Sequence, residues 1–184
     1  MDVRMKNRRV GVPSTGACAL LVSVAALACD KVGAPAAAPS AEHELIGAKA
    51  PDFELSAQGG GSPLSPVAHT GQVVIVDFWA TWCAPCKDSF PFYQSLTDKY
   101  GDQLAVLAVS VDEEPAGIAD FVAETKVTFP VAWDEDQSVT HLYKPETMPT
   151  SYLVDRNGVV QYVHAGFKSG DADGIVQHIE QLLK

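Results

Sequence analysis

The chain has 184 residues, of which 47% are hydrophobic, and a formal net charge of −10 at pH 7. This apolar content is enough for a folded core and excludes disorder over the whole chain. The acidic balance argues against binding to nucleic acid through a basic surface, so no nucleic-acid partner is expected. Acidic residues gather at 112–114 and 134–136, where we expect a solvated surface.

Residues 1–28 have the pattern of a signal peptide. An apolar run at 17–28 (ACALLVSVAALA) follows four early basic residues, Arg4, Lys6, Arg8 and Arg9. The run is shorter than the ~20 apolar residues that span a bilayer. A basic start, a short apolar segment and small residues at its end are typical of a secretory leader. We therefore expect an exported protein.

The leader ends in Ala26-Leu27-Ala28-Cys29, which resembles a bacterial lipobox. The resemblance implies that the signal peptide is of the lipoprotein type and that an acylated Cys29 anchors the chain to a membrane. Ordinary cleavage near Ala28, with no lipid on Cys29, is an alternative, and so is an uncleaved anchor. Residues 29–46, rich in Ala, Pro and Ser, are predicted to be a flexible tether, or an extended terminus without a role.

Residues 47–184 are predicted to form one domain in which strands and helices alternate. A short extended stretch at 50–55 comes first and is followed by a glycine-rich loop at 59–63. Apolar runs and turn signals predict strands at 73–78, 104–111, 129–133, 150–155 and 159–164, and helices at 85–100, 115–125, 135–143 and 171–184. The Asn157-Gly158 pair is a strong signal for the hairpin turn between the last two strands. This order predicts an α/β domain whose mixed sheet has helices on both faces.

The segment VDFWATWCAPCK (residues 76–87) places Cys83 and Cys86 two residues apart, directly after a buried strand. A thiolate is the species that attacks a disulfide, and the start of a helix favours negative charge. We therefore expect Cys83 to be the nucleophile. Cys86, one turn later and more buried, would resolve the mixed disulfide. In an exported chain, such a pair can persist as a redox-active disulfide.

Asp77 lies within the apolar run that precedes the cysteines. Burial of a carboxylate is costly and raises its pKa, which would suit Asp77 to accept the proton of Cys86 near neutral pH. The alternative is that Asp77 lies at the end of the strand, where it is solvated or paired with a lysine such as Lys87.

Other uses of the cysteine pair fit the sequence less well. A structural zinc site needs about four ligands, and the five histidines show no paired spacing. Haem attachment needs a histidine after the second cysteine, where Lys87 stands. A purely structural disulfide would close a very small loop and stabilise the fold little. We therefore expect redox exchange, with no metal and no cofactor.

Residues 78–87 (FWATWCAPCK) resemble the active-site segment of thioredoxins and, more closely, that of the TlpA/ResA-type thiol–disulfide oxidoreductases of the bacterial envelope. Residues 148–158 (MPTSYLVDRNG) are similar to the second signature of that group, in which the proline is cis and packs against the cysteine pair. The resemblance covers about residues 47–184. It implies a thioredoxin-like fold with an N-terminal extension and a central insertion at about 112–147.

The resemblance also implies a substrate-binding groove around the Cys83 sulfur, framed by Trp82, Met148, cis-Pro149 and Gly166. Phe167 is a further candidate, although Trp82 and Phe167 could instead belong to the core. The sequence departs from the group at Asp77, where many members have asparagine. It departs again at Ala84-Pro85, between the cysteines, so the choice of substrate is not defined by the resemblance. The proline of this dipeptide favours a reductant over an oxidant.

The predicted function is therefore that of a lipid-anchored, periplasm-facing oxidoreductase of the bacterial cell envelope. It would reduce disulfides in protein substrates with electrons from an unidentified membrane donor. By resemblance, the clients would be apocytochrome c or other envelope metalloproteins. Three alternatives stay open: a disulfide oxidant or isomerase, a client-binding module without catalysis, and a copper-delivering relative, although the last normally has a wider cysteine spacing.

Overall fold

The computed structural model of the protein describes residues 43–184. The predicted signal peptide (1–28), the candidate lipid site Cys29 and most of the predicted tether (29–46) therefore lie outside the described residues. Within 43–184, none of the helices combines the length and the apolar character needed to cross a membrane.

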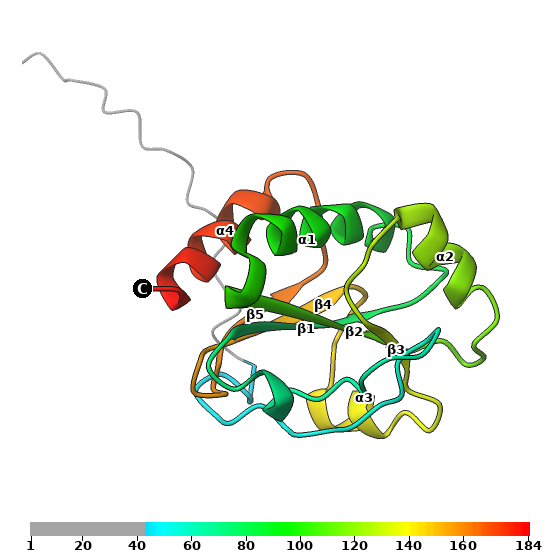
Figure 1. Cartoon of the computed structure of the whole chain (residues 1–184), viewed down its shortest axis with the longest axis horizontal. Helices are drawn as coiled ribbons and strands as arrows, with labels where there is room; N and C mark the ends of the chain where they lie inside the picture. Colours follow the sequence, from blue (N-terminus) through cyan, green and yellow to red (C-terminus); the bar gives the residue numbers. More distant parts are fainter. Residues whose placement is uncertain (1–42) are drawn as a thin grey trace, which may run out of the picture. The chain divides into compact units, whose positions relative to one another are not determined.

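A five-stranded mixed sheet forms the centre of the domain, with the strand order β3-β2-β1-β4-β5 (Figure 1). Its strands are β1 (Val73–Trp79), β2 (Leu104–Ser110), β3 (Val131–Trp133), β4 (Thr150–Val154) and β5 (Val160–Ala165). The central strand β1 pairs parallel with β2 and antiparallel with β4, and every residue of β1 is buried. The continuous apolar run therefore forms a strand that is covered on both faces.

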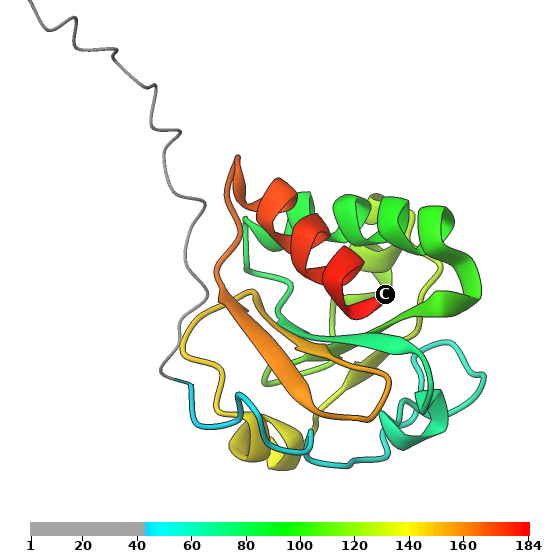
Figure 2. The same ribbon diagram turned by 90° about the vertical axis from the view of Figure 1, so that its left-hand side faces the viewer.

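Four α-helices cover the two faces of the sheet (Figures 1 and 2). They are α1 (Cys86–Tyr100), α2 (Ile118–Thr125), α3 (Ser138–Tyr143) and α4 (Asp171–Leu182). Side chains of α1, α2 and α4 pack in one hydrophobic cluster, whereas α3 and the segment before β1 pack in the other. The predicted α/β fold, with a mixed sheet and helices on both faces, is confirmed.

Alternation along β1 decides which side chains lie beneath α1. Val73, Ile75 and Trp79 belong to the cluster of α1, α2 and α4, whereas Val74, Val76 and Phe78 belong to the opposite cluster. Because side chains of a strand alternate between faces, Asp77 points to the α1 side. Cys83 and Cys86 are part of the same cluster.

Two predicted helices begin later than the sequence indicated. The helix predicted from residue 115 starts at Ile118, because Gly117 adopts a positive φ of 89° just before it. The helix predicted from residue 135 starts at Ser138, where the Asp134 carboxylate accepts hydrogen bonds from two backbone N–H groups of its first turn. The extended stretch at 50–55 does not join the sheet and forms only an isolated bridge between Leu55 and Leu64.

The acidic groups at 112–114 and 134–136 are not wholly solvated, so this prediction was wrong for two residues. Asp112 is 6% exposed and Asp134 is 0% exposed. Both carboxylates are buried because they accept several hydrogen bonds, which offset the loss of hydration. Asp134 caps α3, and Asp112 binds the loop that follows β1.

Candidate active site

Cys83 and Cys86 form a disulfide at the start of α1, with Cα atoms 5.4 Å apart. Cys86 is the first residue of the helix, and its backbone N–H donates to the Cys83 carbonyl oxygen at 3.2 Å. Cys83 is 3% exposed and Cys86 is 0% exposed, so the second cysteine is the more deeply buried. The local turn thus brings the two side chains together without a contribution from distant parts of the chain.

Aromatic packing fixes α1 on the sheet. The Trp79 ring at the end of β1 lies 4.7 Å from the Phe90 ring of α1 and 4.5 Å from the Phe121 ring of α2, measured between centroids. Each such pair contributes about 0.5–1.5 kcal/mol beyond the burial of its apolar area. The turn that contains the two cysteines (residues 83–86) lies between Trp79 and Phe90 in the sequence, so this packing holds the chain on both sides of it.

A buried carboxylate holds the loop between β1 and the cysteines. The Asp112 carboxylate accepts hydrogen bonds from the Thr81 backbone N–H at 3.0 Å and from the Thr81 hydroxyl at 2.7 Å. The Ser110 hydroxyl donates to the same carboxylate at 2.7 Å. The end of β2 is thereby attached to a residue two positions before Cys83. Sequence analysis missed this function of Asp112, and its position directly after a buried strand was the available signal.

The residues predicted to frame a groove are placed at one end of the sheet. Phe78 of β1 pairs with Thr150 of β4, so the residues after β1 and those before β4 lie at the same end. The Met148–Pro149 peptide bond is cis, and the Gly166 N–H donates to the Pro149 carbonyl oxygen at 2.7 Å. Gly166 has a φ of 83°, a conformation that favours glycine.

The two aromatic candidates for the groove differ in exposure. Trp82 is 70% exposed, which is unusual for a large hydrophobic side chain next to a buried disulfide. Phe167 instead packs beneath α1, with its ring centroid 5.4 Å from that of Phe92. Met148 is partly buried against both hydrophobic clusters. Trp82 is thus available at the surface, and Phe167 belongs to the core packing.

Asp77 is fully buried on the α1 face of β1, and neither of its carboxylate oxygens has a hydrogen-bond partner among the described residues. Burial raises the pKa of Asp77 well above its ordinary value, although the hydroxyl of Tyr93 faces the group and lowers the pKa somewhat. Burial and the neighbouring Asp77 charge also raise the pKa of Tyr93. The alternative of a solvated Asp77 is therefore wrong.

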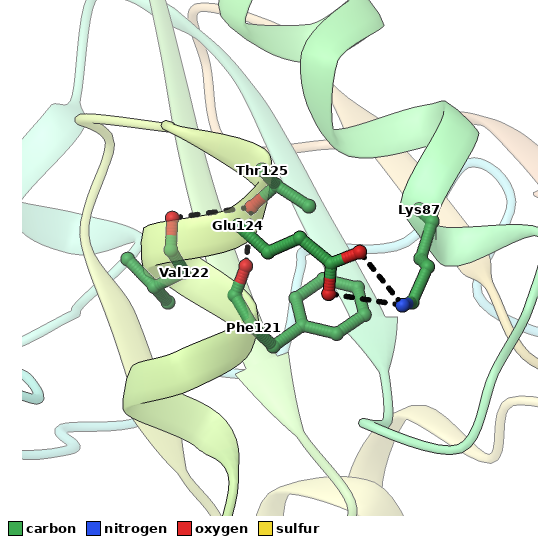
Figure 3. Close-up of polar contacts among 5 residues, drawn as sticks. All are labelled: Lys87, Phe121, Val122, Glu124 and Thr125. Atoms are coloured by element: carbon green, nitrogen blue, oxygen red, sulfur yellow. Dashed lines mark hydrogen bonds and ion pairs between the residues drawn. The ribbon is translucent and has the colours of Figure 1, made fainter.

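Lys87 does not pair with Asp77, because its ammonium group is turned to α2 (Figure 3). The Lys87 Nζ atom lies 2.9 Å from both carboxylate oxygens of Glu124. Next to Glu124 in α2, the Thr125 hydroxyl donates to the Phe121 carbonyl oxygen at 2.8 Å. Both charged side chains are about half exposed, and such surface pairs contribute ~1 kcal/mol or less. The pair matters mainly because it holds Lys87, the lysine nearest in sequence to the cysteines, at the surface.

Sequence analysis also missed a group of polar side chains near Asp77. Tyr93 on α1 and Ser151 on β4 are both buried. His164 on β5 lies 3.1 Å from His178 on α4, measured between ring nitrogens. The two histidines are 14 residues apart, so spacing along the chain gave no signal of their pairing. Residues 43–184 contain no cluster of three or more His, Cys, Asp or Glu side chains arranged to hold a metal ion.

Comparisons with known proteins agree with this geometry. The model of the AhpC/TSA family matches residues 46–163. The thiol-disulfide oxidoreductase ResA of Oceanobacillus iheyensis is 36% identical over 125 residues, which cover 66% of this chain and 65% of that protein, just under two thirds of its length. ResA of Geobacillus thermodenitrificans is 33% identical over 139 residues, with coverages of 74% and 78%.

A solved structure from Chlorobium tepidum has the same fold. It is provisionally named as the thiol:disulfide interchange protein DsbE, and it is 38% identical with a TM-score of 0.71. The match covers 76% of this chain and 98% of that chain. The likeness therefore includes nearly the whole of that structure.

Proposed function

The chain belongs to the AhpC/TSA family, in its ResA-type branch of thiol–disulfide oxidoreductases, and we propose that it reduces disulfide bonds in protein clients. The observation that carries the proposal is the disulfide between Cys83 and Cys86 at the start of α1. The buried Asp77 carboxyl group lies on the face of the sheet that α1 covers, and its raised pKa supports a role in the proton transfers of the pair.

The proposed reaction has two exchange steps. The Cys83 thiolate attacks one sulfur of a client disulfide, so that a mixed disulfide forms and the first client thiolate leaves. The Cys86 thiol then loses its proton and its sulfur attacks Cys83, which releases the second client thiolate and closes the Cys83–Cys86 disulfide. The client gains two electrons and the protein loses two. The position of Cys83 before the first turn of α1 supports its role, because a helix N-terminus stabilises negative charge.

Asp77 is proposed to accept the proton of Cys86 in the second step. Its burial supports this role, since a raised pKa allows a carboxyl group to hold a proton near neutral pH. The shielding of both sulfurs from solvent makes a nearby protein base useful, because water has little access to Cys86.

Client binding is proposed at the end of the sheet that carries Trp82, Met148, cis-Pro149 and Gly166. The exposed Trp82 indole offers apolar contact area beside Cys83, as expected of a residue that dominates a binding surface. An extended client segment could pair with the backbone next to Pro149, as in strand addition to a sheet edge. The family resemblance favours cysteine pairs of apocytochrome c or envelope metalloproteins as clients.

The proposal also includes the direction of disulfide exchange and the cellular location of the domain. Pro85, between the cysteines, favours a reductant, which then requires a membrane donor to restore the dithiol. The lipobox-like residues 26–29 favour a periplasm-facing domain anchored through lipid on Cys29. The equilibrium of the pair with a dithiothreitol buffer tests the direction, since a strongly negative potential marks a reductant.

Two serine variants test the exchange mechanism. We expect Cys83→Ser to abolish reduction of insulin disulfides, because no nucleophile remains. We expect Cys86→Ser to accumulate a mixed disulfide with client on Cys83, because the resolving sulfur is absent. Insulin turbidity and non-reducing gels measure the two outcomes.

Full turnover by Cys83→Ser would rule out the proposed mechanism. The double Cys83→Ser, Cys86→Ser variant separates catalysis from client binding. If it restored full biological activity to a deletion strain, the protein would act as a binding module without redox chemistry.

A further inference from the structure

We propose that Glu124 keeps the cysteine pair strongly reducing by holding the Lys87 ammonium group away from the Cys83 sulfur. The inference rests on the proposed function, in which a Cys83 thiolate begins each exchange. It gives Glu124, on α2, a part in setting the direction of that exchange. Glu124 acts through Lys87 and is therefore a positioning residue.

Lys87 is the basic residue that the sequence places beside the cysteines. It directly follows Cys86, and it is the only lysine or arginine between Lys49 and Lys99. The Cα atoms of Cys83 and Cys86 are 5.4 Å apart. Because consecutive Cα atoms are about 3.8 Å apart, the Cα atom of Lys87 is no more than about 9 Å from that of Cys83. The flexible four-carbon stem of a lysine can span most of this distance.

The backbone continues from the cysteines into α1 without a break in its turns. The Cys86 N–H donates to the Cys83 carbonyl oxygen at 3.2 Å, and the Lys87 N–H donates to the Ala84 carbonyl oxygen at 3.1 Å. Lys87 therefore lies about one turn after Cys83, and residues four apart are neighbours on the surface of a helix. A Lys87 side chain without another partner could thus approach the Cys83 sulfur.

The structure shows the ammonium group directed to α2 instead (Figure 3). The Lys87 Nζ atom lies 2.9 Å from both carboxylate oxygens of Glu124. Core packing places α2 independently of this ion pair, because the Phe121 ring lies 4.5 Å from the Trp79 ring and 5.1 Å from the Phe90 ring, measured between centroids. Glu124 follows Phe121 by about one turn, so the packing also sets the position from which its carboxylate binds Lys87.

The position of this charge matters for the reduced protein. A cation near a cysteine lowers the pKa of its thiol. A more stable thiolate stabilises the reduced form, which makes the disulfide a stronger oxidant. Glu124 opposes this effect, because it offsets the charge of Lys87 and holds it at α2. The ion pair thus favours the proposed reductant independently of Pro85.

The expected effect is small but measurable. An ammonium group about 9 Å from a thiolate, at an effective dielectric constant of about 40–80, lowers the pKa of the thiol by about 0.3–0.7. This change corresponds to about a two- to fivefold change in the thiol–disulfide equilibrium constant. Because both side chains of the ion pair are about half exposed, salt should screen most of the effect.

Two measurements on the reduced full chain test the inference. The chain would carry Cys18→Ser and Cys29→Ser, so that Cys83 and Cys86 are its only thiols. The rate at which iodoacetamide alkylates Cys83, followed by mass spectrometry as a function of pH, gives the pKa of its thiol. Equilibration with dithiothreitol gives the equilibrium constant of the pair.

We expect Glu124→Gln to lower the pKa of Cys83 and to shift the equilibrium about two- to fivefold towards the dithiol at low salt. About 1 M sodium chloride should remove most of this shift. In a Lys87→Gln background, Glu124→Gln should have a clearly smaller effect, since no ammonium group remains to be released.

The matched control is Glu180→Gln. Glu180 forms an ion pair with Lys99, near the other end of the same helix. Lys99 lies about 18 Å from Lys87 along the helix axis, well beyond the Debye length of ~10 Å at 0.1 M salt. The control variant should therefore keep the pKa of Cys83 and the equilibrium constant of the wild type.

Three results would overturn the inference. The first is a pKa of Cys83 that is no lower in Glu124→Gln than in Glu180→Gln. The second is an equal effect of Glu124→Gln with and without Lys87, which would mean that Glu124 acts only through its own charge. The third is an effect that persists in about 1 M salt, which would indicate a structural change. Reduction of insulin that is lost in Cys83→Ser would support the proposed function in each of these cases.

Discussion

Burial of the Asp77 carboxyl group makes the stability of the domain depend on pH. The ordinary pKa of an aspartate is 3.8, and burial raises the pKa of Asp77 well above this value in the folded protein. Below pH 4 the group is protonated in both the folded and the unfolded chain. Above that pH the unfolded chain loses the proton while the folded chain keeps it, so stability falls as pH rises towards the folded pKa.

We therefore expect Asp77→Asn to be more stable than the wild type at pH 7, by at least about 1–2 kcal/mol, since each pH unit between the two pKa values contributes ~1.4 kcal/mol. The difference should shrink towards pH 4. Guanidinium unfolding of the oxidised proteins at pH 4, 7 and 9 measures it. A difference that stays constant over this range would show that Asp77 is not held protonated by burial.

The proposed catalytic residues and the buried polar residues around them differ in how far the sequence could predict them. The cysteine pair lies in one short segment with Asp77, and an acid within an apolar run is a local signal of a buried acid. Tyr93, Ser151 and His164 carry no such signal, because they meet only when β1, β4, β5 and α1 are assembled. Strand register brings them together, and no spacing along the chain encodes it.

At the scale of elements, the link between the end of β2 and the cysteine loop has a testable energetic role. We expect Asp112→Ala to lower the free energy of unfolding by about 2–4 kcal/mol, because buried donors lose charged hydrogen bonds. Turnover should also fall at least about tenfold, since a misplaced reacting group costs rate steeply. Thermal unfolding and insulin reduction measure the two effects.

Asp134→Ala is the matched control for this prediction. Asp134 is also buried and accepts hydrogen bonds from Val139 and Thr140, but these residues belong to α3 and not to the loop before the cysteines. The Asp134→Ala variant should lose a similar free energy of unfolding but should keep its turnover at temperatures below its melting temperature. An equal loss of turnover in both variants would mean that Asp112 acts only through global stability.

The same elements show where prediction of the fold succeeded. The buried strands were placed within one or two residues, because continuous apolar runs have few alternative structures. The errors lie in the connections at 115–117 and 135–137, where a glycine with positive φ and a buried carboxylate determine where helices begin. Both features are local in the sequence, since Asp134 binds N–H groups only five and six residues further on. The apolar pattern alone therefore placed these helix starts too early, because it does not take the capping residues into account.

At the scale of the whole molecule, the proposal of a membrane anchor concerns a segment outside residues 43–184. We expect Cys29→Ala to move the protein from the membrane fraction to the soluble fraction, because the acylated side chain is lost. Cys18→Ala is the control, since Cys18 lies within the predicted leader and should not change the distribution. Fractionation and the mass of the N-terminal peptide measure the outcome, and a wild-type N-terminal peptide without acyl mass on Cys29 would exclude lipidation at this site.

The position of the buried Cys86 within disulfide distance of Cys83 also protects the molecule against oxidants. Peroxide converts an accessible thiolate to a sulfenic acid, which further peroxide turns irreversibly into sulfinic and sulfonic acids. Here the neighbouring thiol can condense with a sulfenic acid on Cys83, releasing water and forming the same disulfide that ends a normal cycle. Oxidative stress would thus leave the protein in the disulfide state that the proposed electron donor would reduce.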